Sequence, residues 1–173
     1  MKVTRLVRLD DAPRLAALLV ANREFLAPWE PIRPESFFTA DGQRRVIEDA
    51  LAGYGRGAAL PHVILHEGRV VGRITLSNVV RGAFQSGNLG YWVDAGHNGR
   101  GLGTGAVGEI RSAAFGELGL HRIEAGTLVH NIRSQRVLER NRFERIGVAA
   151  AYLRIAGRWQ DHILYQALSS ATA

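Results

Sequence analysis

The sequence has 173 residues, of which 46% are hydrophobic and none is cysteine. This composition predicts one folded domain over residues 1–173 and excludes disulfides, thiolate zinc sites and a cysteine nucleophile. The net charge is +6, but the arginines are scattered rather than clustered. That pattern favours a solvated surface over a polyanion partner, so direct nucleic-acid binding is not expected.

The N-terminal half is predicted to form short strands and two helices. It has neither the apolar core of a signal peptide nor a segment long enough to span a bilayer, which predicts a cytoplasmic protein without membrane contact. Asp10 or Asp11 is expected to cap the first helix, and Thr39 to begin the second. The apolar segments 25–31 and 34–38 contain prolines and are expected to be irregular. Hydrophobic spacing gives a strand at 3–9, a helix ending near Arg23, a helix at 39–51, and strands at 62–65 and 70–76.

A strand, a glycine-rich loop and a helix follow one another in residues 88–115. Leu89, Tyr91 and Val93 alternate as in a strand, glycines crowd between residues 96 and 105, and apolar residues then recur at helical spacing. Backbone N–H groups of such a loop can approach an anion closely, and the helix N-terminus adds unsatisfied donors and a favourable dipole. The stretch therefore predicts a seat for a phosphate compound.

The C-terminal residues complete an α+β fold with mostly antiparallel strands. They predict a helix end at Gly119, a strand at 122–129, a helix at 131–141 and two strands after Phe143 that are separated by residues 156–158. Asp161 and His162 are interpreted as a structural pair on the last strand, and Glu109 and Glu124 as solvent-facing.

Two common phosphate seats fit the glycine-rich loop poorly. A P-loop needs a lysine at the helix start, and Lys2 is the only lysine in the chain. Residues 103–108 match the dinucleotide-binding spacing Gly-x-Gly-x-x-Gly. However, that motif belongs after the first strand of a parallel sheet, whereas antiparallel hairpins precede it here.

The segment 98–103, Asn-Gly-Arg-Gly-Leu-Gly, resembles the coenzyme A motif of the GNAT acetyltransferase superfamily, with Asn98 in place of the usual Gln or Arg. The resemblance implies a mixed, mostly antiparallel sheet of about seven strands, flanked by about four helices, with strands four and five splayed apart. It also implies acetyl-CoA as co-substrate and no metal. The residues expected to bind coenzyme A are Trp92, Val93, Asn98, Gly99, Arg100, Gly101, Leu102, Gly103, Thr104 and Asn131.

More narrowly, the chain resembles the RimJ/RimL branch of that superfamily, the ribosomal-protein-alanine N-acetyltransferases. The similarity rests on segments in both halves, at residues 22–36, 77–82, 89–91, 120–125, 130–143 and 157–162. It implies direct acetyl transfer from acetyl-CoA to an amine in a ternary complex, with a protein N-terminus, such as that of a ribosomal protein, as acceptor. The sequence departs from the family pattern at Asn98, at Arg142, where glycine is common, and at Gly105 and Gly108 inside the helix.

The resemblance assigns catalytic roles to few side chains. The tyrosine that many members place near the leaving thiolate corresponds to Leu138, so Ser134 is expected to serve the thiolate. With Asn131 it can equally form a helix N-cap worth about 1 kcal/mol. Glu30 is the candidate base or amine anchor, and it can equally be a solvated loop carboxylate. Trp29 and Tyr91 are expected to contact the acceptor.

Alternatives to protein acetylation stay open on the sequence alone. A small-molecule amine would use the same chemistry, because substrate loops diverge faster than the cofactor site. A non-catalytic ribosome- or RNA-binding module would keep the fold without the reaction. The sequence is compatible with a monomer or a homodimer.

Overall fold

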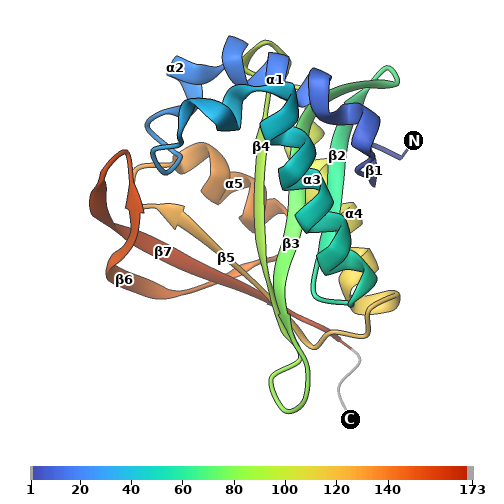
Figure 1. Ribbon diagram of the computed structural model, residues 1–173. Coiled ribbons are helices and arrows are strands. Elements are labelled where there is room, and N and C mark those ends of the chain that lie inside the picture. The colour runs from blue at the N-terminus through green and yellow to red at the C-terminus, as the bar shows by residue number, and fades with distance from the viewer. Residues whose placement is uncertain (1, 171–173) are drawn as a thin grey trace.

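The computed structural model describes residues 2–170, and a sheet of seven strands runs through them in the order β1-β2-β3-β4-β5-β7-β6 (Figure 1). Neighbouring strands are antiparallel except β4 and β5, which are parallel. This confirms the predicted mixed sheet. The strands are β1 Thr4–Leu6, β2 Leu60–His66, β3 Arg69–Val80, β4 Ser86–Val93, β5 Arg122–Leu128, β6 Glu144–Ile155 and β7 Arg158–Leu168.

Within residues 2–170 there are five α-helices rather than about four. They are α1 Ala12–Ala21, α2 Arg23–Leu26, α3 Ala40–Gly55, α4 Leu102–Gly116 and α5 Ile132–Arg140. Short 3-10 turns cover Leu9–Asp11, Glu35–Phe38 and Ala95–His97. The extra helix is α2, because Asn22 interrupts the first helix and the chain completes another turn before Pro28 ends it. The segment that was expected to be irregular is therefore partly helical.

Helices cover both faces of the sheet and define two hydrophobic clusters. On one face, α1 and α3 pack Leu15, Leu18 and Ile47 against β2 and β3. On the other face, α4 and α5 enclose the larger cluster, with Ile110 of α4 fully buried. Figure 1 shows α1 and α3 in front of β3 and β4, and α4 on the far side. None of the helices in residues 2–170 is long and apolar enough to cross a membrane.

The sheet opens between its two parallel strands. The ladder between β4 and β5 joins only Ser86–Asn88 to Arg122–Glu124. Beyond Asn88, β4 has no partner on its β5 side in the ladders of the described chain. Figure 1 shows the two strands diverging, with α5 behind the opening. The splay confirms the predicted separation of strands four and five, and it leaves backbone hydrogen-bonding groups of residues 89–93 available.

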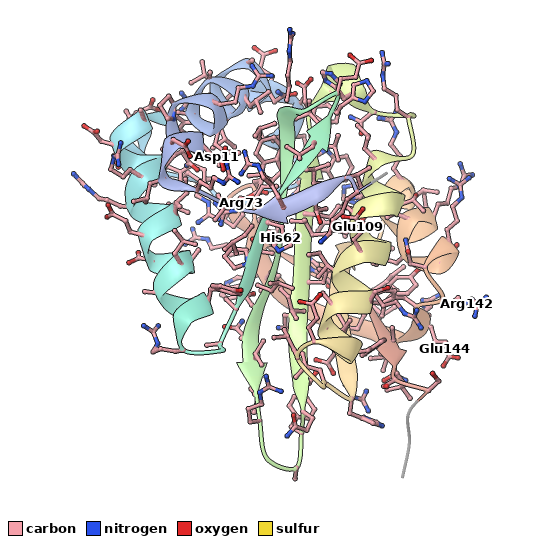
Figure 2. All side chains as sticks on the ribbon, turned by 90° about the vertical axis from the view of Figure 1, so that its right-hand side faces the viewer. Asp11, His62, Arg73, Glu109, Arg142 and Glu144 are labelled. Carbon is pink, nitrogen blue, oxygen red and sulfur yellow. The ribbon has the colours of Figure 1, made fainter. Side chains whose placement is uncertain are left out.

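Two acidic residues differ from their predicted roles. Asp11 precedes α1 but makes no side-chain cap; its carboxylate binds the Arg5 guanidinium at 2.7 Å and accepts from the Arg8 N–H at 2.8 Å. Glu109 is not solvent-facing. It accepts the N–H groups of Val3 and Thr4 and the Thr4 hydroxyl, at 2.6, 2.8 and 2.6 Å, and so ties α4 to the first strand (Figure 2). Thr39 does cap α3, accepting the Gly42 N–H at 3.0 Å.

The unusual glycines of α4 have a packing reason. A Cβ on Gly105 would lie 3.1 Å from Val3 Cγ2, and one on Gly108 would lie 3.1 Å from Asn141 Oδ1. Each glycine costs about 1 kcal/mol of helix propensity relative to alanine. Because neither residue has a Cβ, α4 can approach the first strand and the end of α5 closely. The helix itself ends at Gly116, earlier than the predicted end at Gly119.

Arg142 occupies a backbone position that favours glycine. The N–H of Phe143 donates to the Leu138 carbonyl at 3.1 Å and the N–H of Arg142 to the Glu139 carbonyl at 2.9 Å, the two hydrogen bonds of a Schellman motif. In this motif the residue after the C-cap is left-handed, and Arg142 has φ of 60°. The backbone at the end of α5 is therefore strained by having Arg142 where glycine is common in the family. Figure 2 shows the Arg142 side chain projecting from the molecule.

Candidate active site

The loop between β4 and α4 has the geometry of an anion seat. Gly99 and Gly101 have φ of 78° and 76°, and a Cβ on either would meet no atom within 4 Å, so the space above the loop is open. Gly101 is the N-cap of α4, and no side chain caps the helix. The first N–H groups of this 15-residue helix have no partner within the helix, and no described side chain accepts from them. This arrangement suits the pyrophosphate of coenzyme A.

A buried asparagine from the first helix holds the start of that loop. Asn22 is 2% exposed; its amide nitrogen donates to Asp94 Oδ1 at 2.6 Å, and its carbonyl accepts the Ala95 N–H at 2.8 Å. His97 Nδ1 lies 2.5 Å from the other Asp94 oxygen. Burial raises the pKa of Asp94, but the hydrogen bonds from His97 and Asn22 outweigh it and leave this pKa below its usual value. The cluster fixes where β4 ends and the loop begins.

A cavity of about 660 Å³ lies on the opposite face of the sheet, between β3 and β4 and the segment that contains α1, α2 and the Glu35–Phe38 turn. Its floor is formed by polar side chains of β3 and by β4, and its walls are mostly apolar. The lining residues used below are Arg23, Glu30, Arg33, Phe37, Phe38, Arg73, Thr75, Ser77, Tyr91 and Trp92. We call this space the acceptor cavity.

Tyr91 connects the acceptor cavity to the start of α5. Tyr91 lines the cavity, but its ring lies on the α4 side of the sheet, packed against the larger hydrophobic cluster and 4.0 Å from where a Cβ of Gly103 would be. Its hydroxyl is 2.8 Å from Ser134 Oγ and 3.3 Å from the Ser134 carbonyl oxygen. Burial raises the pKa of Tyr91 to about 12, with the Ser134 hydrogen bond opposing the shift, so the phenol keeps its proton at neutral pH.

Asn131 and Ser134 form the N-cap of α5. The Asn131 side-chain oxygen accepts the Ser134 N–H at 3.2 Å. This bond fixes the first turn of α5 and aims the Ser134 hydroxyl at Tyr91. Capping uses the Ser134 backbone N–H, so its hydroxyl, which is hydrogen-bonded to Tyr91, takes no part in the cap.

Glu30 lies in the acceptor cavity with its side chain 35% exposed. Its carboxylate is 3.6 Å from the Arg33 guanidinium. Burial raises the pKa of Glu30 above its usual value, and the charges of Arg33 and Arg73 only partly offset this effect. The Glu30 backbone carbonyl accepts the Ala156 N–H at 3.0 Å, so the turn between β6 and β7 holds the loop that carries Glu30.

Trp29 and Trp92 do not place their side chains where the sequence predicted them. Trp29 does not line the acceptor cavity; its ring packs on His130 with centroids 5.3 Å apart, at the edge of α5. Trp92 pairs with Arg73 in the sheet, so its side chain faces the acceptor side and only its backbone is available to coenzyme A. The Val93 side chain packs toward the α4 side, close to Gly103.

The remaining residues of the predicted cofactor seat lie together at the start of α4. Asn98 and Arg100 are exposed on the loop, whereas the Leu102 side chain is buried in the core. Thr104 lies in the first turn, where its carbonyl accepts the Asn141 side-chain amide at 3.1 Å. The backbone of this segment is thus held from below by α5.

Several residues of the site escape sequence reasoning. Asn22 and Asp94 are 72 positions apart, and nothing in their local sequence relates them. Arg73 was missed because alternating polar residues on a strand normally indicate a solvent face. Asp161 and His162, interpreted from the sequence as a structural pair, have separate partners: Asp161 accepts the N–H of Ala151, which has φ of 45° at a bulge in β6, and His162 Nδ1 lies 2.9 Å from the Gln160 carbonyl oxygen.

Comparison with known proteins decides the family. The family model described as an acetyltransferase (GNAT) domain matches residues 3–144. The chain belongs to the GNAT acetyltransferase family. It is 37% identical over 164 residues to the Escherichia coli (strain K12) [ribosomal protein uS5]-alanine N-acetyltransferase, covering 94% of this chain and 84% of that protein. The protein is accordingly an acetyl-CoA-dependent N-acetyltransferase.

Solved structures of GNAT relatives agree with this assignment. The ribosomal-protein-S5-alanine acetyltransferase from Vibrio fischeri superposes with a TM-score of 0.93 at 33% identity, covering 97% of this chain and 93% of that one. RimJ of Mycobacterium smegmatis, in complex with CoA-disulfide, has a TM-score of 0.92 at 32% identity over 96% of this chain and 81% of that one. A GNAT relative of the same fold therefore binds a coenzyme A derivative.

Proposed function

We propose that the protein transfers an acetyl group from acetyl-CoA to the N-terminal α-amino group of a protein, with a ribosomal protein that begins with alanine or serine as acceptor. One observation carries the proposal. The acceptor cavity reaches the splay between β4 and β5 at Tyr91, so an amine in the cavity can meet a thioester that comes from the α4 side. A ribosomal acceptor implies a cytoplasmic enzyme.

The residues at this meeting point supply the groups that acetyl transfer needs. Bound acetyl-CoA supplies the thioester, and the start of α4 would hold its pyrophosphate. Glu30 accepts the amine proton as general base or anchors the ammonium group. Alternate residues between 89 and 93 direct their N–H groups away from β3 toward the splay, and these groups stabilise the charge that develops on the carbonyl oxygen.

Ser134 acts on the leaving sulfur through a hydrogen bond, and Tyr91 acts through Ser134. A thiol has a pKa of about 8.5. The phenol of Tyr91 has a pKa of about 12, so full transfer of its proton to a thiolate is unfavourable. The hydroxyl of Ser134 therefore donates a hydrogen bond to the thiolate, and Tyr91 holds that hydroxyl in place.

A screen of acceptors tests the proposal. Peptides that begin with Ala or Ser are compared with polyamines, amino acids and aminoglycosides at a fixed acetyl-CoA concentration, and the released thiol is measured. We expect turnover on the peptides. Turnover on small amines alone would contradict the proposal and assign the acceptor cavity to a small molecule.

A further inference from the structure

The floor of the acceptor cavity carries a polar row on a strand whose other face is apolar. Arg73, Thr75 and Ser77 alternate along β3 with Ile74 and Leu76, and the last two are fully buried in the cluster beneath α4. Such a row ordinarily faces water on the open side of a sheet. Here helices cover it, and Figure 2 shows Arg73 on the side of the sheet where α3 lies. The row is therefore enclosed in a ligand-sized space.

The Arg73 guanidinium has few partners in this enclosure. A guanidinium carries five N–H donors. Within residues 2–170, the one hydrogen bond of Arg73 runs from Nε to Thr75 Oγ1 at 3.5 Å, the outer limit for such a bond, and no carboxylate lies within 4 Å. Arg73 is half-buried, and a cation taken partly out of water without a partner is costly because its desolvation is not compensated.

The other two arginines of the acceptor cavity are engaged. Arg23 forms an ion pair with Glu35 and lies over the Phe38 ring at 4.3 Å. Arg33 lies over the Phe37 ring at 4.8 Å and is 3.6 Å from Glu30. Arg73 is thus the one lining arginine, in the described part of the chain, whose charge lacks a close partner. Its donors are available to a ligand in the cavity.

We propose that Arg73 selects acceptors that carry a carboxylate close to the reacting amine, namely protein N-termini with Asp or Glu among their second to fourth residues. The inference rests on the proposed function and names the class of N-terminus that the cavity prefers. A carboxylate would accept two parallel hydrogen bonds from the planar guanidinium of Arg73 and neutralise its charge. Glu30, which acts on the amine in the proposed function, lines the same cavity, and its charge acts on Arg73, so the amine and the carboxylate of one short segment can be bound together.

Peptides with paired acidic and neutral residues test this selection. The set begins with Ala and places Glu, or isosteric Gln, at position 2, 3 or 4, and kcat/KM is measured for the wild type, Arg73→Gln and Arg73→Lys. Charged hydrogen bonds of this kind correspond to about a 10- to 100-fold preference for Glu over Gln at one position. Arg69→Gln is the matched control, since Arg69 lies exposed on the same strand outside the cavity.

The expected pattern separates selection from a structural role. Arg73→Gln should lose the preference, so that its kcat/KM values for Glu and Gln peptides become equal whatever their absolute level, Arg73→Lys should keep part of the preference, and Arg69→Gln should keep all of it. Equal turnover of Glu and Gln peptides by the wild type, or an unchanged preference in Arg73→Gln, would overturn the inference but leave peptide acetylation standing. If no peptide is acetylated although acetyl-CoA binds, the proposed acceptor and this inference both fail.

Discussion

Replacing Ser134 by alanine tests how the leaving group is stabilised. The Ser134 hydroxyl lies 2.8 Å from the Tyr91 hydroxyl, and the proposed mechanism aims it at the thiolate. A hydrogen bond to a charged group is worth about 1.5–3 kcal/mol, so kcat should fall about 10- to 100-fold. The KM for acetyl-CoA should change little, because the bond is made only as charge develops on sulfur.

The same substitution should leave the fold nearly intact. The Tyr91 hydroxyl can still donate to the carbonyl of residue 134 at 3.3 Å, and the N-cap uses the backbone N–H of that residue. We therefore expect the free energy of unfolding to fall by less than about 1 kcal/mol. Denaturant unfolding provides this control for Ser134→Ala.

Tyr91→Phe and the double variant extend the test. If Tyr91 acts by orienting the Ser134 hydroxyl, Tyr91→Phe lowers kcat in the wild type but has no further effect in Ser134→Ala. The assay is thiol release at saturating acetyl-CoA and peptide. Full turnover by Ser134→Ala would refute the reasoning. Additive losses in the double variant would show that the two hydroxyls act separately.

Three further outcomes follow from the structure. Below the raised pKa of Glu30, protonation of Glu30 should make wild-type kcat/KM fall a further tenfold per pH unit, beyond the loss due to protonation of the amine. Glu30→Gln should lack this additional loss, and its persistence in the variant would exclude Glu30 as the base. Arg142→Gly should relieve the positive φ and stabilise the fold by about 0.5–1 kcal/mol, raising Tm, whereas Arg136→Gly inside α5 should lower it. Asn22→Ala should cost about 3 kcal/mol in denaturant unfolding and raise the KM for acetyl-CoA; an unchanged KM would separate the Asn22 cluster from cofactor binding.

The raised pKa of Glu30 also predicts a sign for stability. An acid whose pKa is higher in the folded than in the unfolded state destabilises the fold wherever it is ionised. Folding is therefore opposed by this carboxylate above its folded pKa and unaffected below its unfolded pKa. Glu30→Gln should raise Tm at neutral pH and have no such effect in acid. This is the expected cost of holding a carboxylate in a partly apolar cavity.

Local chemistry made much of this fold predictable from the sequence. The glycine-rich loop, the N-caps at Thr39 and Asn131 and the strand periodicities depend on neighbouring residues, and the structure has them in place. What escaped prediction depends on contacts distant in the sequence. The local sequence of Glu109 is typical of a solvated helix residue, but in the structure the start of the chain, more than 100 positions away, lies beside it. Arg73 reads as a surface residue until helices cover its face of the sheet.

The candidate site is assembled across the splay by contacts from the C-terminal half. The N–H of Ala156 donates to the carbonyl of Glu30, and the ring of Trp29 packs on His130 just before α5. A Cβ on Gly157 would lie 2.9 Å from Ile32, so the β6–β7 turn touches the same loop. These contacts hold the loop that carries Glu30 against the C-terminal half of the chain. In the proposed mechanism, the β6–β7 turn thereby holds the residue that acts on the amine.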